Sequence, residues 1–282
     1  MEDNTQVKKR QTWFTEYQTD SLSLGLRIDD ILAAETTQFQ EMLVAETETF
    51  GRMLALDGAV QTTDKDEFVY HEMITHVPLF MLDAPKKVAV IGGGDGGAIR
   101  EILKHPTVEE AHLVEIDRKV VDAAREFFPA ISVALDEPKA HVHYTDGIEW
   151  VRNARDFDVI VVDSTDPVGP AEGLFRAEFY QSIARALTDQ GILVAQSESP
   201  FLHQDLIRSM KEGMKTAFPH VNLYVAAIPT YPSGLWSFMM ASKKPVKPAE
   251  RVRTASIPTR YWTPAIQDAA FVLPRFVVEL MQ

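Results

Sequence analysis

The stretch that decides the fold is KKVAVIGGGDGGAIREILKHP, residues 86–106. The apolar run KVAVI ends in a glycine-rich loop, and a segment with helical character follows the loop. A strand, a tight glycine turn and a helix N-terminus in this order are typical of nucleotide-binding α/β sheets. Gly92, Gly94 and Gly97 satisfy the pattern G-x-G-x-x-G, which lets the backbone approach a ligand closely. The pattern alone does not distinguish an NAD enzyme from an adenosylmethionine enzyme.

Strands and helices alternate along the chain after this unit. Further strands are predicted at residues 111–117, 141–147, 157–163 and 191–197, and helices at residues 119–128, 175–187 and 203–218. Five strands with helical crossovers predict a mostly parallel, doubly wound α/β sheet. A last pair of strands, at residues 222–229 and 235–242, is joined only by TYPSG. This connection is too short for a parallel crossover, so the pair is expected to be antiparallel.

The first 62 residues have a different pattern. Leu22, Leu24, Leu26 and Ile28 alternate with other residues, as in a half-buried strand. Asp57-Gly58 lies between two short apolar runs and predicts a hairpin. A helix is then expected over residues 63–82, where TTDKDEF supplies N-cap candidates. We therefore expect a small β domain at residues 1–62 and a Rossmann-type catalytic domain at residues 63–282.

The composition excludes several classes of protein. The 28 Lys and Arg residues against 41 Asp and Glu residues give a net charge of −13, which repels nucleic acid and anionic membrane and attracts cations. Cysteine is absent, which excludes disulfides and thiolate chemistry and suits a reducing compartment. The sequence has neither a membrane-length apolar run nor the apolar core of a secretory signal. We expect a cytoplasmic protein with small-molecule substrates, no nucleic acid partner and no membrane partner.

One residue of the glycine loop distinguishes an NAD enzyme from an adenosylmethionine enzyme. A dinucleotide would place its pyrophosphate on this loop, where the carboxylate of Asp95 would repel it. Adenosylmethionine would place its amino-acid tail there, and Asp95 would also disfavour the carboxylate of that tail. A donor that keeps only the ammonium of the tail would be favoured.

Acids also follow the next two strands of the predicted sheet. Glu115 lies at the end of the strand predicted within residues 111–117, twenty residues beyond Asp95, where it can accept hydrogen bonds from a ribose diol. Asp146-Gly147 ends the following strand, where an acid can accept a bond from the adenine amino group. Ligands of open α/β sheets bind outside the carboxyl ends of the strands. The three strand ends together predict an adenosine pocket.

The strand at residues 157–163 ends in DSTDPVGP and supplies the candidate catalytic acids. Asp163 ends a fully apolar strand, and Asp166 follows it three residues later. Residues 168–173 are rich in Gly and Pro and could cover the site as a lid. A pair of acids beside an adenosine pocket suits a polycationic substrate. We expect Asp163 to accept a proton from an attacking amine, while Tyr70 and Tyr231 wall the site and lower the amine pKa by burial.

Four segments together resemble the spermidine synthases: GGGDGG, DSTDPVGP, IPTYPSG and LDGAVQTTDKDEFVYHEM. The resemblance runs from about Trp13 to AAFVLPRF near the C-terminus, which is nearly the whole chain. It implies a methyltransferase-like sheet with an N-terminal β domain, and a homodimer or homotetramer. It also implies transfer of an aminopropyl group from decarboxylated S-adenosylmethionine to putrescine, giving spermidine and 5′-methylthioadenosine. The decarboxylated donor is then a co-substrate, and no cofactor is expected.

The resemblance also implies roles for individual residues. Asp163 matches the proton acceptor of the family, and Asp166 matches an acid that holds the acceptor amine. The positions implied to bind the donor or methylthioadenosine are Gln40, Asp95, Glu115, Asp146, Gly147 and Pro170. The positions implied to bind the polyamine are Tyr70, His71, Asp95, Asp163, Asp166, Gln196 and Tyr231. No metal site is expected, because the eight histidines are scattered along the chain.

The sequence leaves several alternatives open. Putrescine N-methyltransferase has the same scaffold but transfers methyl from intact adenosylmethionine, and Asp95 argues against it. The acceptor could instead be agmatine, cadaverine or spermidine, because the sequence does not set the length of the channel. A catalytically dead scaffold is disfavoured by the intact Asp163 and Asp166. An NAD dehydrogenase is disfavoured because no hydride-transfer constellation accompanies the glycine loop.

Overall fold

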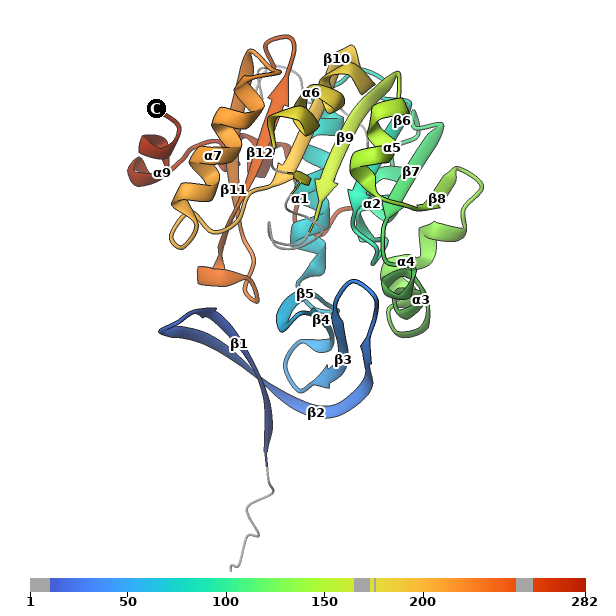
Figure 1. Cartoon of the computed structure of the whole chain (residues 1–282), viewed down its shortest axis with the longest axis vertical. Coiled ribbons are helices and arrows are strands. Elements are labelled where there is room, and N and C mark those ends of the chain that lie inside the picture. Colours follow the sequence, from blue (N-terminus) through green and yellow to red (C-terminus); the bar gives the residue numbers. More distant parts are fainter. Residues whose placement is uncertain (1–10, 165–172, 175, 247–255) are drawn as a thin grey trace, which may run out of the picture.

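The computed structural model describes residues 11–164, 173–174, 176–246 and 256–282. A five-stranded sheet comes first in the chain, and a seven-stranded sheet flanked by helices follows it (Figure 1). The predicted class is confirmed: the fold is α/β, with a mostly parallel, doubly wound, methyltransferase-like sheet and a small N-terminal β domain.

The N-terminal sheet is an antiparallel meander. Its strands lie side by side in chain order: β1 (Thr12–Thr19), β2 (Leu22–Thr36), β3 (Glu41–Thr47), β4 (Gly51–Leu56) and β5 (Ala59–Thr63). The hairpin predicted at Asp57-Gly58 joins β4 to β5, with Leu56 opposite Ala59. Asp57 and Gly58 have φ angles of 47° and 80°. Two consecutive positive φ angles match the twist of a tight hairpin, which explains the Asp-Gly pair.

The second sheet carries the predicted parallel core. Its strands are β6 (Lys87–Gly92), β7 (Glu110–Glu115), β8 (Ala140–Tyr144), β9 (Phe157–Asp163), β10 (Leu187–Gln196), β11 (His220–Ala227) and β12 (Leu235–Ser242). They lie in the order β11-β12-β10-β9-β6-β7-β8. The strands from β10 to β8 are parallel to one another. As predicted, β11 and β12 are antiparallel, and β12 also runs antiparallel to β10.

Helices and short 3₁₀ turns connect the strands. They are α1 (Glu67–Phe80), α2 (Gly97–Leu103), α3 (Arg118–Phe127), α4 (Pro129–Ser132), η1 (Val133–Asp136), α5 (Gly147–Asn153), α6 (Ala177–Ala186), α7 (Gln204–Lys215), η3 (Pro232–Gly234), α8 (Pro264–Ala270) and α9 (Arg275–Leu280). Several predicted boundaries were wrong by a few residues, and the largest errors are at the starts of α1 and β10. Thr63 lies in β5, opposite Met53, so α1 starts four residues later than expected. Leu187 lies in β10, opposite Phe157, and does not extend α6.

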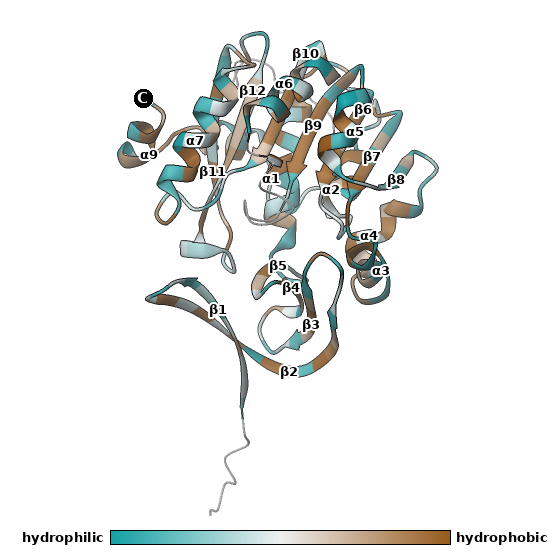
Figure 2. Ribbon diagram, viewed as in Figure 1, coloured by the Kyte–Doolittle hydropathy of each residue, from teal (hydrophilic) through white to brown (hydrophobic). Residues whose placement is uncertain are grey.

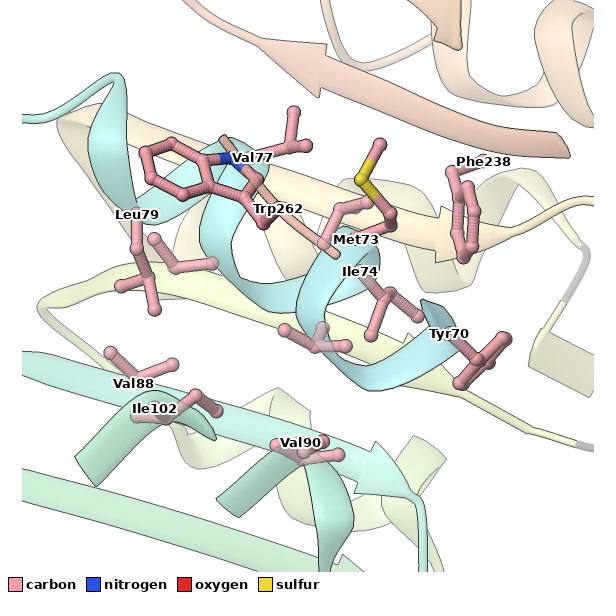
Figure 3. Close-up of a cluster of buried hydrophobic side chains, with 14 of the residues drawn as sticks. Tyr70, Met73, Ile74, Val77, Leu79, Val88, Val90, Ile102, Phe238 and Trp262 are labelled. Carbon is pink, nitrogen blue, oxygen red and sulfur yellow. The ribbon is translucent and has the colours of Figure 1, made fainter. Parts of the chain in front are cut away.

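Apolar side chains pack on both faces of the seven-stranded sheet, and the central strands are strongly hydrophobic (Figure 2). On one face, Met73, Ile74 and Val77 of α1 lie in one cluster with Val88 and Val90 of β6 (Figure 3). On the other face, α5, α6 and α7 contribute to a second cluster. Covering both faces buries the parallel strands, as such sheets require.

A third apolar cluster joins the N-terminal sheet to the segment of α3 and α4. Met42 and Val44 of β3 and Leu54 of β4 pack with Val120 of α3 and Phe128. The N-terminal sheet is therefore held against the helices that follow β7, close to the carboxyl edge of the parallel strands. Among the described helices, none combines the length and the apolar character that a bilayer crossing requires.

Candidate functional site

A pocket opens at the carboxyl ends of the parallel strands, where ligands of open α/β sheets bind. The glycine loop after β6 and the ends of β7 and β9 line one side. The N-terminal sheet lines the other side, through residues that include Gln40, Leu54 and Gln61. Both sheets therefore contribute to one site.

The glycine loop packs directly against the end of β9. The Gly93 N–H donates to the backbone oxygen of Asp163 over 2.8 Å. A Cβ atom on Gly92 would lie 2.1 Å from that same oxygen, and Gly92 has a φ of 82°. Only glycine fits both the close approach and the left-handed backbone. The loop is thereby held beside the catalytic candidate.

Asp95 lies on this loop as a buried carboxylate. Its Oδ1 accepts a hydrogen bond from the Gly97 N–H over 2.8 Å, and its Oδ2 is 3.2 Å from His71 Nε2. Burial works to raise the pKa of Asp95, but His71 and the Gly97 N–H outweigh it and hold the pKa below its ordinary value. Asp95 therefore presents a negative charge to the pocket.

Glu115 and Gln40 lie close to Asp117, a residue that the sequence analysis did not single out. Glu115 Oε1 accepts from the Asp117 N–H over 2.8 Å. Asp117 Oδ2 accepts from Gln40 Nε2 over 3.1 Å and from Thr37 Oγ1 over 2.7 Å. Burial, with the nearby charge of Asp117, raises the pKa of Glu115 to about 7. Asp117 thus ties the N-terminal sheet to the end of β7.

Asp146 and Gly147 lie where β8 gives way to α5, and both line the pocket. Asp146 is the N-cap of α5, and its Oδ1 accepts from the Ile148 N–H over 2.7 Å. A Cβ atom on Gly147 would lie 2.4 Å from Ile91 Cγ2, so this position has no room for a side chain. The two residues shape the pocket beside the ends of β6 and β7.

Asp163 is hydrogen-bonded to Tyr70, one of the two tyrosines that were predicted as walls, and Tyr70 packs beside the other. The Tyr70 hydroxyl donates a short hydrogen bond to Asp163 Oδ1, and the rings of Tyr70 and Tyr231 are 5.5 Å apart. Burial and the charge of Asp95 raise the pKa of Asp163 to about 6, while His71 acts in the opposite direction. Asp163 is mostly ionised at neutral pH, yet it is a stronger base than an exposed aspartate.

The loop that carries Tyr231 is anchored to the start of α1. Asp66 Oδ2 accepts from the Thr230 N–H over 3.0 Å and from Thr230 Oγ1 over 2.7 Å. The Tyr231 hydroxyl donates to the Gln61 backbone oxygen over 2.6 Å. Asp66 was considered only as a possible cap of α1, but it also positions the wall of the pocket.

Gln196 lies at the end of β10 and contacts a further acid. Its Nε2 donates to Ser164 O over 3.1 Å and lies 3.2 Å from Glu198 Oε1. Glu198 is 2 % exposed, lines the pocket and has a φ of 64°. A buried acid with a strained backbone is characteristic of functional sites. The sequence analysis missed Glu198, although its position just after a strand end was a usable signal.

Glu16 was also missed. It comes from β1, lines the pocket and accepts a hydrogen bond from the Val60 N–H over 3.0 Å. Nothing in the local sequence marks it, because only the packing of the N-terminal sheet brings it to the pocket.

The remaining predicted features fall partly outside the described residues. Asp166, Pro170 and residues 168–172 of the candidate lid lie outside the described residues. The ten other predicted site residues all line the one pocket, namely Gln40, Tyr70, His71, Asp95, Glu115, Asp146, Gly147, Asp163, Gln196 and Tyr231. Within the part of the chain that the structure describes, no group of three or more His, Cys, Asp or Glu residues is arranged to hold a metal ion.

Comparison with known proteins decides the family. The profile of the spermine/spermidine synthase domain matches residues 67–250, and that of the spermidine synthase tetramerisation domain matches residues 12–64. The polyamine aminopropyltransferase of Caldicellulosiruptor bescii is 53% identical over 279 residues, covering 98% of this chain and all of the relative. That of Bacillus subtilis is 49% identical over 275 residues, covering 96% of this chain and 99% of the relative.

The chain belongs to the spermidine synthase family. Solved structures agree with this assignment. A spermidine synthase in complex with the transition state analogue AdoDATO superposes with a TM-score of 0.92 at 38% identity, covering 96% of this chain and 94% of the other. Spermidine synthase from Thermotoga maritima gives a TM-score of 0.91 at the same identity and coverage. The resemblance seen in the four sequence segments is confirmed, and the prediction of a polyamine aminopropyltransferase enzyme is confirmed with it.

Proposed function

We propose that the chain transfers the aminopropyl group of decarboxylated S-adenosylmethionine to putrescine, giving spermidine and 5′-methylthioadenosine. The observation that carries the proposal is the buried, ionised Asp95 on the glycine loop, 3.2 Å from His71. A carboxylate at this point attracts the ammonium of a decarboxylated tail and repels the carboxylate of an intact one. Family membership supports aminopropyl transfer as the reaction.

The donor nucleoside would lie across the ends of β6, β7 and β8. Glu115 is proposed to accept from the ribose diol, and Asp146 with Gly147 to contact the adenine. Gln40, held by Asp117, would contact the nucleoside from the N-terminal sheet. Pro170, which lies outside the described residues, is proposed to line the same nucleoside on sequence resemblance alone.

The reaction is a displacement at the carbon next to the sulfonium. The neutral nitrogen of putrescine forms a new N–C bond while the C–S bond breaks, and the bonding pair remains on sulfur as a neutral thioether. The nitrogen then loses one proton, which Asp163 accepts. The donor is already activated, so alignment of the two reactants supplies much of the rate.

The reaction needs the acceptor amine in its neutral form, which is scarce at pH 7. A primary amine has a pKa near 10.4, so deprotonation at pH 7 costs about 4 to 5 kcal/mol. Tyr70, which donates to Asp163, and Tyr231 enclose the attack site with aromatic surface. Burial among these rings lowers the amine pKa, while the far ammonium needs a carboxylate. We assign the polyamine contacts to Tyr70, Asp163, Gln196 and Tyr231, and to Asp166 from its sequence position.

A panel of acceptors tests the proposal. Methylthioadenosine release is measured with the decarboxylated donor and putrescine, cadaverine, agmatine or spermidine. The proposal expects putrescine to give the highest kcat/KM. A higher kcat/KM for any other amine would refute the assignment of the acceptor, and no release with any of the four would refute aminopropyl transfer.

We also propose the assembly, the cofactor requirement and the location. The match of residues 12–64 to a tetramerisation domain supports a homo-oligomer, either a homodimer or a homotetramer. We propose that the reaction needs no cofactor or metal, because the donor brings its own leaving group. A cytoplasmic location stays a prediction, based on composition and on the absence of cysteine.

A further inference from the structure

A chain of ion pairs runs from the pocket into the interface of α1 and α2. His71 Nε2 is 3.2 Å from Asp95 Oδ2, and His71 Nδ1 is 2.6 Å from Glu67 Oε2. The same Glu67 oxygen is 2.8 Å from Arg100 Nη2. The chain continues from Arg100 Nε to Glu101 Oε1 over 2.8 Å. The charges alternate in sign along the whole series.

His71 has no ring nitrogen left for a ligand. The side chain is 2 % exposed, and each of its nitrogens already faces a carboxylate. A Cβ atom on Gly97 would lie 2.2 Å from the imidazole ring, so the ring is packed directly on the backbone at the start of α2. Burial opposes the charged ring, but Asp95 and Glu67 hold the pKa of His71 well above its ordinary value. His71 is therefore an imidazolium that pairs with Asp95 in the pocket wall.

The position of His71 offsets the repulsion between two carboxylates of the pocket. Asp95 and Asp163 repel each other, and Asp95 is the principal charge that raises the pKa of Asp163. A cation inside the pocket would keep both acids ionised but would repel an ammonium substrate. His71 lowers the pKa of both acids from the pocket wall, where both of its ring nitrogens are paired and its side chain is 2 % exposed. Glu67 in turn offsets the cost of burying that cation.

Glu67 depends on Arg100 for its own charge and orientation. Burial works to raise the pKa of Glu67, and the hydrogen bonds and charges of His71 and Arg100 lower it below its ordinary value. Arg100 is also fixed by Glu101 and by the Ala130 backbone oxygen, 3.2 Å from Nη1. The guanidinium thus orients the Glu67 carboxylate toward His71.

We propose that Glu67, held by Arg100, is a positioning residue that keeps His71 charged and so presents Asp95 and Asp163 as carboxylates to the substrate ammonium groups. The proposal rests on the proposed function for its substrate. The groups that face His71 are Glu67 and Tyr70 from α1, Asp95 from the glycine loop, Arg100 from α2 and Asp163 from β9.

The test compares three variants with the wild type. Glu67→Gln keeps the shape but removes the carboxylate that lies between His71 and Arg100, while Arg100 keeps its ion pair with Glu101. Glu67→Gln with Arg100→Met removes both charges and leaves His71 with Asp95 alone. The control is Lys104→Met, because Lys104 Nζ also pairs with Glu101, over 2.6 Å, but its further hydrogen bond goes to the Pro258 oxygen and not to Glu67 or His71. Two readouts are taken: the protonation midpoint of the His71 ring by NMR, and kcat/KM for putrescine against pH.

In Glu67→Gln the His71 midpoint is expected to fall by about 1 to 3 pH units, the usual effect of a close charge. When His71 loses its proton, the pKa of Asp163 rises, so the acid limb of kcat/KM moves to higher pH. The double variant is expected to recover part of both shifts. Lys104→Met is expected to leave both readouts unchanged.

An unchanged His71 midpoint in Glu67→Gln overturns the inference while leaving the proposed function intact. The inference is also overturned if the His71 midpoint falls further in the double variant than in Glu67→Gln. That result would mean that Arg100 does not act through Glu67. Loss of rate without a shift of the acid limb would reduce Glu67 to a structural role and also overturns it. If the wild-type protein shows no aminopropyl transfer, the proposed function is refuted instead. The NMR midpoints still test the charge of His71 in that case, because they need no turnover.

Discussion

Replacing Asp163 by Asn should lower activity and raise stability at the same time. The change keeps the side-chain shape and removes the negative charge that faces Asp95. Loss of a general base typically costs about 10²–10⁴-fold in rate. We therefore expect kcat to fall by at least about a hundredfold with donor affinity nearly intact.

The stability gain follows from the pKa of Asp163. The pKa is about 6 in the folded protein against an ordinary value of 3.8, so the folded state binds the proton more tightly than the unfolded chain does. A raised acid pKa favours folding at low pH, and this advantage is lost as pH rises from about 3.8 to about 6. By linkage, the ionised carboxyl costs at most about 3 kcal/mol at pH 7 and roughly half of that at pH 5. Asp163→Asn removes the cost, while the Tyr70 hydroxyl can still donate to the asparagine Oδ1 in a weaker bond that no longer involves a charge.

Two assays check this prediction. Methylthioadenosine release gives kcat, and thermal unfolding at pH 7 and pH 5 gives the stability. We expect a higher melting temperature for Asp163→Asn at pH 7 and a smaller difference at pH 5. Asp205→Asn is the matched control, because the Asp205 side chain is fully exposed, and it should change neither quantity. Turnover within a few-fold of wild type, or a lower melting temperature at pH 7, would refute the reasoning.

Three further predictions follow from the pocket. Asp95→Asn should weaken binding of the decarboxylated donor and narrow its preference over intact adenosylmethionine; calorimetry with both ligands checks this, and an unchanged affinity ratio would contradict it. Tyr231→Ala should admit water, raise the pKa of the bound amine and move the rising limb of rate against pH at low putrescine to higher pH, whereas Tyr231→Phe should move it less; superimposed profiles would show that Tyr231 does not exclude water. Gly97→Ala should displace the His71 ring, 2.2 Å from the new Cβ, and cost about 1 to 3 kcal/mol in unfolding free energy by denaturant titration, whereas an unchanged midpoint would mean that the ring moves freely.

The sequence predicts the parts of the fold that depend on local signals. Asp57-Gly58 predicts its hairpin because few residue pairs accept two positive φ angles. The acids at the ends of β6, β7, β8 and β9 could be grouped because parallel strands bring their carboxyl ends to one edge. Topology alone is therefore enough to gather Asp95, Glu115, Asp146 and Asp163 in one pocket.

Contacts between distant segments could not be predicted in this way. Gln40 reaches Asp117 across 77 positions of sequence, and Asp66 reaches Thr230 across 164. Glu16 lies in the pocket lining because β1 packs beside β5, where Glu16 accepts from the Val60 N–H. Such contacts arise from tertiary packing, for which a single sequence carries no local signal. The same limit applies to the start of α1, since the pairing of Thr63 with Met53 extends β5 at the expense of the helix.

His71 illustrates a finer limit. Its sequence position resembles a polyamine contact, and the structure brings it to the pocket wall. Its two nitrogens are nevertheless both taken by Glu67 and Asp95. Sequence spacing places Glu67 and His71 one helical turn apart, but it does not reveal the partner on the other nitrogen. The direct role of His71 toward polyamine stays a prediction, and the ion pairs favour an indirect one.

Competition between two donors tests the proposed reaction most directly. The purified protein is given putrescine with equal concentrations of decarboxylated and intact adenosylmethionine at pH 7.5, and the products are separated by mass spectrometry. If Asp95 selects the tail without a carboxylate and Asp163 accepts the amine proton, spermidine and methylthioadenosine form in equal amounts, and N-methylputrescine stays at background. N-methylputrescine as the main product, or spermidine formation unaffected by Asp163→Asn, would contradict the account.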